Sequence, residues 1–306
     1  MSIALCIPAY NAESHLADLL GDALAQTEPF AEIWVHDDAS QDRTAELAES
    51  RGARVMRSAN NVGCSLGKDR LLRRIRSPYV HFHDADDRLS PGFVAHARRW
   101  IRGDADVVLF GFNYVDSETG ALLATRTFDD DALTADPVGY CISERINAIC
   151  GLYATEAVLA NGGYQMPPEQ LFNEDQAFHC RLARAGLRFR ADPTVLITNT
   201  RRAGSMSDTA ARACIDAQYE VMAEAARLSP GYEDEVGQRL WRIAAVAASL
   251  NSWPTADKAA ALAASISRRG PGQGHGAFRW LARHTPRLAV RLRERAIRWL
   301  GKREER

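Results

Sequence analysis

Val80-His81-Phe82-His83-Asp84-Ala85-Asp86-Asp87 is the stretch that decides the fold, because it joins a run typical of a buried strand directly to three carboxylates. Like charges packed this closely disfavour their own ionisation and cost stability unless a cation neutralises them. Hard oxygen ligands in small number suit Mg²⁺ or Mn²⁺, with phosphate oxygens and waters completing the coordination. The stretch therefore predicts a strand that ends at a metal and phosphate site. The alternative is an exposed polar turn before the next helix.

The residues around this stretch alternate short apolar runs with amphipathic segments, which is typical of a largely parallel α/β sheet. Strands are expected at 3–7, 32–36, 54–56, 79–83 and 106–110, and helices at 13–25, 42–51, 65–76 and 91–101. The first three strands each run into a polar loop. Because open α/β sheets bind ligands at the carboxyl ends of their strands, we expect a nucleotide site there.

The second half of the chain is less regular. The expected elements are a hairpin at 115–127, a strand at 148–153, a helix capped by Thr155, a helix that follows Asn173 and ends at Gly186, and a strand pair at 187–190 and 194–198. The expected domains are a first domain over 1–207, a helical extension over 208–267, a Gly-rich linker over 268–277 and a basic amphipathic helix over 278–306.

Three further polar clusters lie at the predicted ends of elements. Pro8-Ala9-Tyr10-Asn11 ends the first strand, where the proline stops the ladder and Tyr10 follows it. Asp37-Asp38 ends the second strand, where one carboxylate either grips a ribose or base or caps the next helix. Asn173-Glu174-Asp175 opens a helix, where carboxylates favour the helix dipole.

Taken in order, these clusters resemble the family 2 inverting glycosyltransferases over about residues 1–207. The matching stretches are Pro8-Ala9-Tyr10-Asn11, Asp37-Asp38-Ala39-Ser40-Gln41-Asp42, Asn61-Val62-Gly63, Asp84-Ala85-Asp86-Asp87 and Glu174-Asp175. The resemblance implies an α/β protein with the GT-A fold, which is Rossmann-like with a mostly parallel central sheet and flanking helices. An α-helical C-terminal region is expected to follow.

The resemblance also implies roles for individual residues. Pro8, Tyr10 and Asn11 would border the nucleotide base, Asp38 would bind the uridine part, and Lys68 and Ala85 would line the nucleotide-sugar site. Asp86 would ligate the metal, and Asp84 would bond the ribose or the metal as the other half of a DxD motif. Asp175 would be the catalytic base, and Glu174 would position the acceptor or the loop. A divalent ion would offset the charge that develops on the departing diphosphate, and inversion needs a base on the opposite face.

Three stretches depart from the family pattern. Gly67-Lys68-Asp69 stands where many members have Ala-Arg-Asn. Lys68 retains a positive charge for pairing with phosphate or Asp38, but as a point charge and not as the planar fork of arginine. Arg201-Arg202 stands where some relatives have a histidine ligand: either one of the two arginines clamps the diphosphate, or the segment is an ordinary basic loop. His36 stands where an apolar residue is commoner, and we assign it no role.

The charge of the chain is unevenly distributed. The 38 Lys and Arg nearly balance the 39 Asp and Glu, but residues 268–306 carry twelve basic and three acidic residues, a net +9. Leu288, Leu292, Ala296 and Trp299 repeat at helical spacing within this tail. The tail either docks on anionic lipid or packs its leucine stripe on the acidic body or a second subunit, so a homodimer stays open. Nucleic acid is the weaker partner, because no binding motif accompanies the charge.

The scattered cysteines, the absence of a basic stretch before the first apolar run and the lack of a long apolar segment favour a cytoplasmic location. Peripheral attachment to the inner face of the cell membrane is left open. The leading hypothesis is a metal-dependent, hexosyltransferase-type enzyme that moves a sugar from a UDP-sugar to a hydroxyl of a glycan or lipid-linked glycan, in bacterial surface polysaccharide or glycolipid synthesis.

Two alternatives are weighed against this hypothesis. A nucleotidyltransferase would show a Gly-rich, basic phosphate loop after the first strand, which Pro8-Ala9-Tyr10-Asn11 is not. A non-catalytic protein that binds a nucleotide-sugar or a glycan would be indicated by an altered Asp86 or Asp175, and both carboxylates are present.

Overall fold

The computed structural model describes residues 2–101, 103, 105–202, 204, 209–267, 269–272 and 276–304. The chain divides into two compact units. The first contains Met1–Pro137, Ile146–Met166 and Arg181–Ala203, and the second contains Val138–Arg145, Pro167–Cys180 and Gly204–Arg306. The first domain is expected from the sequence to span 1–207, but two segments within it, Val138–Arg145 and Pro167–Cys180, belong to the second unit.

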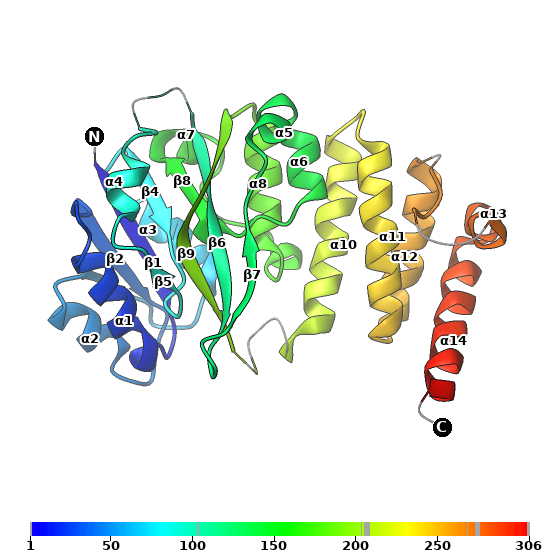
Figure 1. Ribbon diagram of the computed structural model, residues 1–306, viewed down its shortest axis with the longest axis horizontal. Helices are drawn as coiled ribbons and strands as arrows, with labels where there is room; N and C mark the ends of the chain where they lie inside the picture. The colour runs from blue at the N-terminus through cyan, green and yellow to red at the C-terminus, as the bar shows by residue number, and fades with distance from the viewer. Residues whose placement is uncertain are drawn as a thin grey trace. The chain divides into compact units, whose positions relative to one another are not determined.

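The first unit is built on one mixed sheet, whose described strands follow the order β3-β2-β1-β4-β8-β6-β9-β5, with β7 paired to β6 (Figure 1). The strands are β1 (Ile3–Ala9), β2 (Glu32–Asp37), β3 (Arg54–Arg57), β4 (Tyr79–Phe82), β5 (Arg88–Leu89), β6 (Val107–Asp116), β7 (Leu122–Arg126), β8 (Gly151–Ala154) and β9 (Phe189–Arg201). Parallel pairing joins β3, β2, β1 and β4, and it joins β6 to β9. β8 pairs antiparallel with both of its neighbours.

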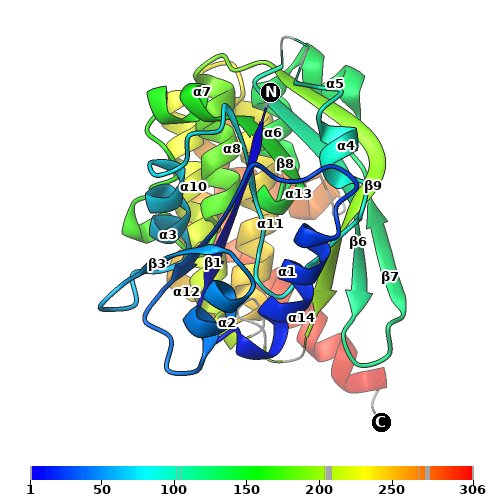
Figure 2. The same ribbon diagram turned by 90° about the vertical axis from the view of Figure 1, so that its left-hand side faces the viewer.

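The order of the first four strands places helices on both faces of the sheet. The helices are α1 (Glu13–Leu24), α2 (Thr44–Ser50), α3 (Cys64–Leu72), α4 (Phe93–Ala97), α5 (Asp130–Ala135) and α7 (Thr155–Ala160), with a 3₁₀ turn at Ala148–Cys150. The crossovers through α1 and α2 run in one direction along the sheet, and the crossover through α3 runs back past β1. Because such crossovers are right-handed, α3 lies on the opposite face from α1 and α2 (Figure 2).

This reversal makes the carboxyl ends of β1 and β4 the topological switch point, which is where open α/β sheets bind ligands. All seven residues of β1 are buried, as expected for a central strand covered on both faces. The His83 amide donates to the Cys6 carbonyl at 3.0 Å and continues the pairing just past β4. The acidic stretch that follows β4 therefore begins at this switch point.

Several elements differ from the sequence-based expectations. The strand pair expected at 187–190 and 194–198 is one continuous strand, β9, which runs beside β6 with an irregular register near Gly111. A Cβ atom at Gly111 would lie 2.8 Å from the Pro193 carbonyl oxygen, so the glycine admits the bulge. Thr155 does not cap its helix: it is the first residue of α7, and its hydroxyl donates to the Ser77 carbonyl at 2.8 Å.

The second unit is helical. It contains most of α6 (Pro137–Ser143), a 3₁₀ turn at Pro168–Gln170, the first part of α8 (Glu174–Arg184), α10 (Ala211–Leu228), α11 (Glu233–Ser249), α12 (Trp253–Ile266), α13 (Gly276–His284) and α14 (Pro286–Glu304). The single helix expected over 278–306 is thus two helices, because Pro286 disfavours a helical conformation at Thr285. Residues 268 and 273–275 of the expected linker lie outside the described residues. No helix in the described ranges is both long and apolar enough to span a membrane.

Two histidines form a buried chain beneath the acidic stretch. His81 Nδ1 lies 2.8 Å from the Gly151 carbonyl oxygen, so this nitrogen carries the hydrogen and donates. His81 Nε2 then accepts from His83 Nδ1 at 3.0 Å. Burial, reinforced by the nearby Lys68 charge, lowers the pKa of His83 to about 3, and burial also lowers the pKa of His81. Both imidazoles are therefore neutral in the folded protein at neutral pH.

The buried, neutral pair of His81 and His83 predicts that the protein loses folding stability in acid. Below about pH 6.5 the unfolded histidines bind protons that the folded ones do not, so stability is lost as the pH falls, by up to about 1.4 kcal/mol per pH unit for each histidine. The measurement is urea unfolding at a series of pH values between neutral and mildly acidic. His83→Gln should flatten the loss in this interval. An unchanged slope in the variant would contradict the assignment.

Candidate active site

Asp38 connects three of the matched motifs. Its backbone amide donates to the Ala9 carbonyl at 2.9 Å, which joins the ends of β1 and β2. Its carboxylate is buried and accepts from the amides of Val62 and Gly63, both at 2.8 Å. Gly63 has a φ of 86°, a conformation that glycine adopts without strain, and α3 begins directly after it. Asp38 therefore fixes the start of α3 at the carboxyl edge of the sheet.

The loop after β1 is held to the loop after β2. The Asn11 amide donates to Ser40 Oγ at 2.9 Å, and Asn11 Oδ1 accepts from the Gln41 amide at 2.8 Å. Asn11 has a φ of 48°, which asparagine tolerates better than most residues do. The preceding Tyr10 is 50% exposed. The site thus holds its backbone in place and leaves one aromatic ring open to solvent.

Each of the two accessible carboxylates after β4 faces a cation of the same chain. Lys68 Nζ, which is buried, lies 3.4 Å from Asp84 Oδ1 and 5.1 Å from the centre of the Tyr164 ring. Arg202 Nη1 donates to Asp86 Oδ2 at 3.0 Å, and Arg202 Nη2 donates to the Asp86 carbonyl at 3.2 Å. Burial and the Asp84 charge raise the pKa of Asp86, against the opposing effect of Arg202.

Asp87 is the third carboxylate of the stretch, and it has a different environment. It is buried, and it accepts from Asn199 Nδ2 and from the Thr200 amide, both at 2.8 Å. Burial, followed by the charges of Asp84 and Asp86, raises its pKa well above the usual range. Asp87 therefore ties the acidic stretch to β9, and nothing in the sequence distinguished it from its neighbours.

The donor set at this position fits a small, hard cation. Partial burial and, second to it, the charge of Asp84 disfavour the ionised form of Asp86 and raise its pKa, and a divalent cation beside the two carboxylates would offset both effects. Mg²⁺ and Mn²⁺ take few protein carboxylates and complete their coordination with waters and phosphate oxygens. Within the described residues, no group of three or more His, Cys, Asp or Glu side chains is arranged to hold a metal. The two carboxylates alone would therefore hold a cation weakly, and phosphate oxygens would strengthen its binding.

The predicted base and its neighbour lie in the second unit, whereas the residues above lie in the first. Both are in the first turn of α8, where Glu174 is buried and Asp175 is half-buried. The Asp175 carbonyl accepts from Nδ1 of the buried His179 at 2.7 Å. Asp175 is thus the more accessible of the two acidic residues.

Two of the departures from the family pattern form one packing arrangement. His36 is buried, and a Cβ atom on Gly67 would lie only 2.7 Å from His36 Nδ1. His36 Nε2 lies 3.0 Å from Ser58 Oγ, which also accepts from Arg70. Lys68 follows Gly67 in α3 and reaches Asp84. A glycine at position 67 therefore lets α3 approach β2 closely enough to accommodate the histidine.

Arg201 and Arg202 have separate surroundings. Arg202 binds Asp86, whereas the Arg201 guanidinium lies 5.5 Å from the centre of the Tyr114 ring. Ala203 and the stretch Ser205-Met206-Ser207 that follows lie outside the described residues. Of the two arginines, Arg202 is the one placed beside the acidic stretch.

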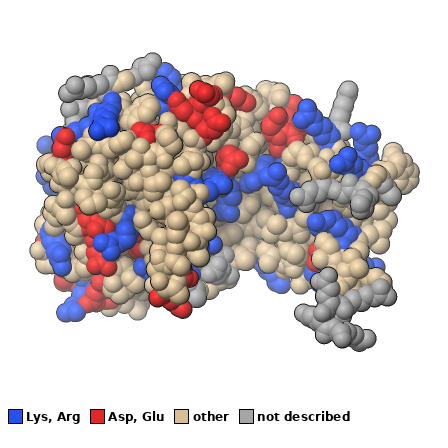
Figure 3. Space-filling view, viewed as in Figure 1, with Lys and Arg blue, Asp and Glu red and all other residues tan. Residues whose placement is uncertain are grey.

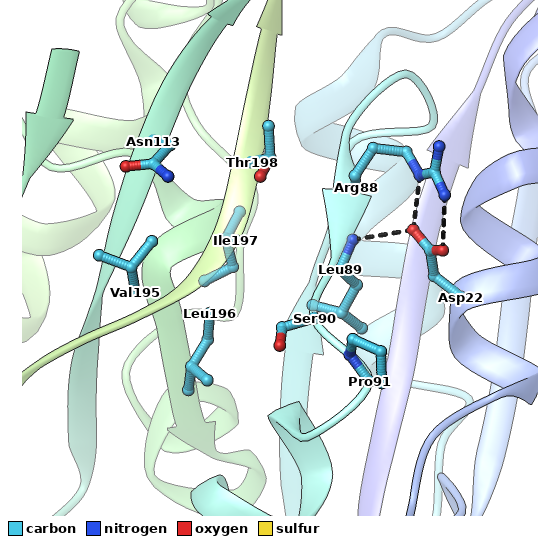
Figure 4. Close-up of a pocket in the computed structure, with 10 residues that line it drawn as sticks. All are labelled: Asp22, Arg88, Leu89, Ser90, Pro91, Asn113, Val195, Leu196, Ile197 and Thr198. Carbon is cyan, nitrogen blue, oxygen red and sulfur yellow. Dashed lines mark hydrogen bonds and ion pairs between the residues drawn. The ribbon is translucent and has the colours of Figure 1, made fainter. Parts of the chain in front are cut away.

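A cavity of about 400 Å³ lies elsewhere in the first unit, between α1, β5 and β9 (Figure 4). The charged groups that line it satisfy one another, because Asp22 accepts from Arg88 at 2.6 and 2.8 Å and from the Leu89 amide at 3.1 Å. None of the candidate site residues lines this cavity. We therefore assign the site from the carboxylates at the switch point and not from this cavity.

Comparison with solved structures defines the fold. The chain has the GT-A fold: it superposes on residues 1–349 of *S. aureus* TarS in complex with UDP-GlcNAc with a TM-score of 0.72 and 19% identity, covering 98% of this chain and 92% of that one. It also resembles a *Pyrobaculum calidifontis* mannosyltransferase in complex with GDP-Man and Mn²⁺, with a TM-score of 0.57 and 17% identity over 95% of this chain and 86% of that one.

Residues 4–146 match the model of glycosyl transferase family 2. Curated relatives include glycosyltransferase GlyG of *Streptococcus pneumoniae*, 23% identical over 56% of this chain and 58% of the relative. Another is the putative teichuronic acid biosynthesis glycosyltransferase TuaG of *Bacillus subtilis*, 28% identical over 28% of this chain and 36% of the relative. In several curated relatives, the region that matches this chain spans about two fifths of the relative's length. The family resemblance predicted from the motifs is confirmed.

The contact between Gly67 and His36 predicts strong coupling between these positions. Gly67→Ala should destabilise the protein by about 1–3 kcal/mol through overpacking, although alanine favours helices by up to about 1 kcal/mol. In a His36→Val background the same substitution should be neutral or stabilising. Denaturant unfolding of the two single variants and the double variant measures the coupling.

Gly21→Ala is the matched control, because this helical glycine has nothing within 4 Å of the added Cβ atom. It should stabilise the protein modestly in both backgrounds. Additive effects of Gly67→Ala and His36→Val would show that the two residues do not constrain one another.

Proposed function

We propose that this protein is an inverting glycosyltransferase that transfers a sugar from a UDP-sugar to a hydroxyl of an acceptor glycan. The observation that carries the proposal is the pair of accessible carboxylates, Asp84 and Asp86, at the switch point of the sheet, each beside a cation of the chain. The family match and the UDP-GlcNAc complex of TarS support a nucleotide-sugar donor.

The nucleotide would lie along the edge formed by the loops after β1 and β2. Pro8, Tyr10 and Asn11 would border the base, and the exposed Tyr10 ring offers a face for stacking. Asp38 holds the beginning of α3 in place, and it would bind the uridine part with the acceptor capacity that remains on its oxygens. Ala85, which lies between the two carboxylates in the sequence, would line the nucleotide-sugar site.

The diphosphate leaving group would meet Lys68 and Arg202. Both side chains donate hydrogen bonds and carry positive charge, which stabilises the negative charge that appears on the leaving oxygen. Mg²⁺ or Mn²⁺ held by Asp84 and Asp86 would supply further charge stabilisation on the phosphate oxygens. Arg202 would release Asp86 as the cation binds, and its planar guanidinium then suits a phosphate.

Asp175 would take the proton of the attacking hydroxyl. As the acceptor oxygen bonds to the anomeric carbon, the bond from this carbon to the phosphate oxygen breaks, and the diphosphate leaves with the electron pair. Attack from the face opposite the leaving group inverts the anomeric centre. Glu174, which is buried, would position the start of α8 or the acceptor.

The acceptor would be a glycan or lipid-linked glycan of a bacterial cell surface, assembled on the inner face of the cell membrane. The relatives named above support this class of product, since TuaG is named for teichuronic acid biosynthesis.

Asp175→Asn tests the assignment of the base. The amide cannot accept the proton, so the transfer rate should fall by about 10²–10⁴-fold or more while UDP binding stays within about twofold of the wild type. UDP release and calorimetry with UDP measure the two effects. Asp131→Asn, at an exposed position in the first turn of α5, is the matched control and should change neither. Near-normal transfer by Asp175→Asn would exclude Asp175 as the base.

Arg202→Ala tests the exchange between arginine and metal. Without its competing cation, Asp86 should bind Mn²⁺ in the absence of nucleotide about two- to fivefold more tightly, as expected for the loss of a partly exposed ion pair. Calorimetric titration with Mn²⁺ measures this change without catalysis. Arg201→Ala should leave Mn²⁺ affinity unchanged, because Arg201 contacts Tyr114 instead. Unchanged or weaker Mn²⁺ binding by Arg202→Ala would exclude the exchange.

A further inference from the structure

One face of α14 is fixed to the rest of the second unit. Ala289, Val290 and Glu294 are buried where α14 packs on α11 and α12. Arg291 binds Asp257 at 2.6 Å. Arg298 binds Glu294 at 2.8 Å and also donates to the Ala248 carbonyl at 3.1 Å. The side of α14 that packs is therefore made of small, apolar and ion-paired residues, and it does not include the leucine stripe.

The leucine stripe faces solvent. Leu288, Leu292 and Trp299 are 47%, 44% and 56% exposed, and Arg295 is exposed between them. Their spacing of three and four residues places all four on one side of the helix, which we call the outward face of α14. The expectation that this stripe packs on the protein body is wrong for the second unit, because a different face of the helix makes that contact.

The charge around this face has one sign. Arg283 and Arg287 are exposed near the start of α14, and Trp280 of α13 is 64% exposed. Glu294 is the one acidic residue within 276–301, and it is buried in its ion pair with Arg298. In Figure 3 the surface over α13 and α14 shows basic and uncharged side chains with little acidic surface. The outward face is thus an apolar strip surrounded by basic side chains.

We propose that the outward face of α14 docks on an anionic lipid bilayer. Leucine and tryptophan side chains would enter the boundary between headgroups and acyl chains, where tryptophan is favoured, and the arginines would remain among anionic headgroups. A second copy of the chain is the less suitable occupant, because symmetric pairing through this face would bring arginines against arginines. The proposal concerns a surface of the second unit and does not rest on sugar transfer.

Sedimentation of the full chain with vesicles tests the proposal. The protein should bind vesicles of phosphatidylcholine with about one third phosphatidylglycerol, bind phosphatidylcholine alone weakly, and be released as salt screens the charges. Arg287→Gln with Arg295→Gln should weaken binding to anionic vesicles about thirtyfold, at about fivefold for each arginine. Leu288→Ser, Leu292→Ser and Trp299→Ser combined should weaken it by more than about tenfold.

Leu122→Ser with Leu123→Ser is the matched control, because these leucines of β7 are 60% and 55% exposed but belong to the first unit. This variant should bind vesicles as the wild type does, and circular dichroism should show every variant folded. Failure of the wild type to bind anionic vesicles would overturn the proposal, as would unchanged binding by the folded triple serine variant. A wild-type dimer that the triple variant converts to a monomer, with vesicle binding unchanged, would assign the face to self-association instead. None of these outcomes depends on donor or acceptor.

Discussion

The crowding of three carboxylates directly after β4 is the constraint on which the rest of the site depends. The three carboxylates have three different partners. The Thr200 amide of β9 donates a hydrogen bond to Asp87, Lys68 faces Asp84, and Arg202 binds Asp86. Only the first of these uses the backbone of the sheet. The other two are ion pairs with long side chains: Arg202 and Asp86 are partly exposed, whereas Lys68 is buried beside the partly exposed Asp84. The same crowding thus fixes one carboxylate and leaves two available.

The topology explains why this crowding occurs where a donor would bind. Reversal of strand order at β1 opens the carboxyl edge between β1 and β4, and Asp38 ties the start of α3 to that edge. α3 in turn carries Lys68 toward Asp84. The proposed base comes from a helix of the second unit, and the outward face of α14 belongs to that unit as well. The residues proposed to bind the nucleotide and the diphosphate belong to the first unit, apart from these two features of the second.

The positions of Asp38, Asp84 and Asp86 at the carboxyl edge of the sheet could be predicted from the sequence, because these residues follow apolar strands whose ends meet at one edge. The distinct role of Asp87 could not be predicted, because it depends on β9, more than a hundred residues away, and the sequence pattern predicts two strands in place of β9. The contact between His36 and Gly67 could not be predicted for a similar reason, because it depends on how α3 packs against β2. Helical spacing revealed the leucine stripe of α14 but not which face packs, since Ala289 and Val290 form a second apolar strip.

The central claim is that Asp84 and Asp86 form a site for a nucleotide diphosphate and a divalent cation. Calorimetric titration of the wild-type protein with UDP, in the presence of Mn²⁺ and again with a chelator, tests it most directly. Removal of the metal should weaken UDP binding by at least about tenfold, and this difference should disappear in Asp86→Ala. Equal UDP affinity with and without Mn²⁺ in the wild type would contradict it.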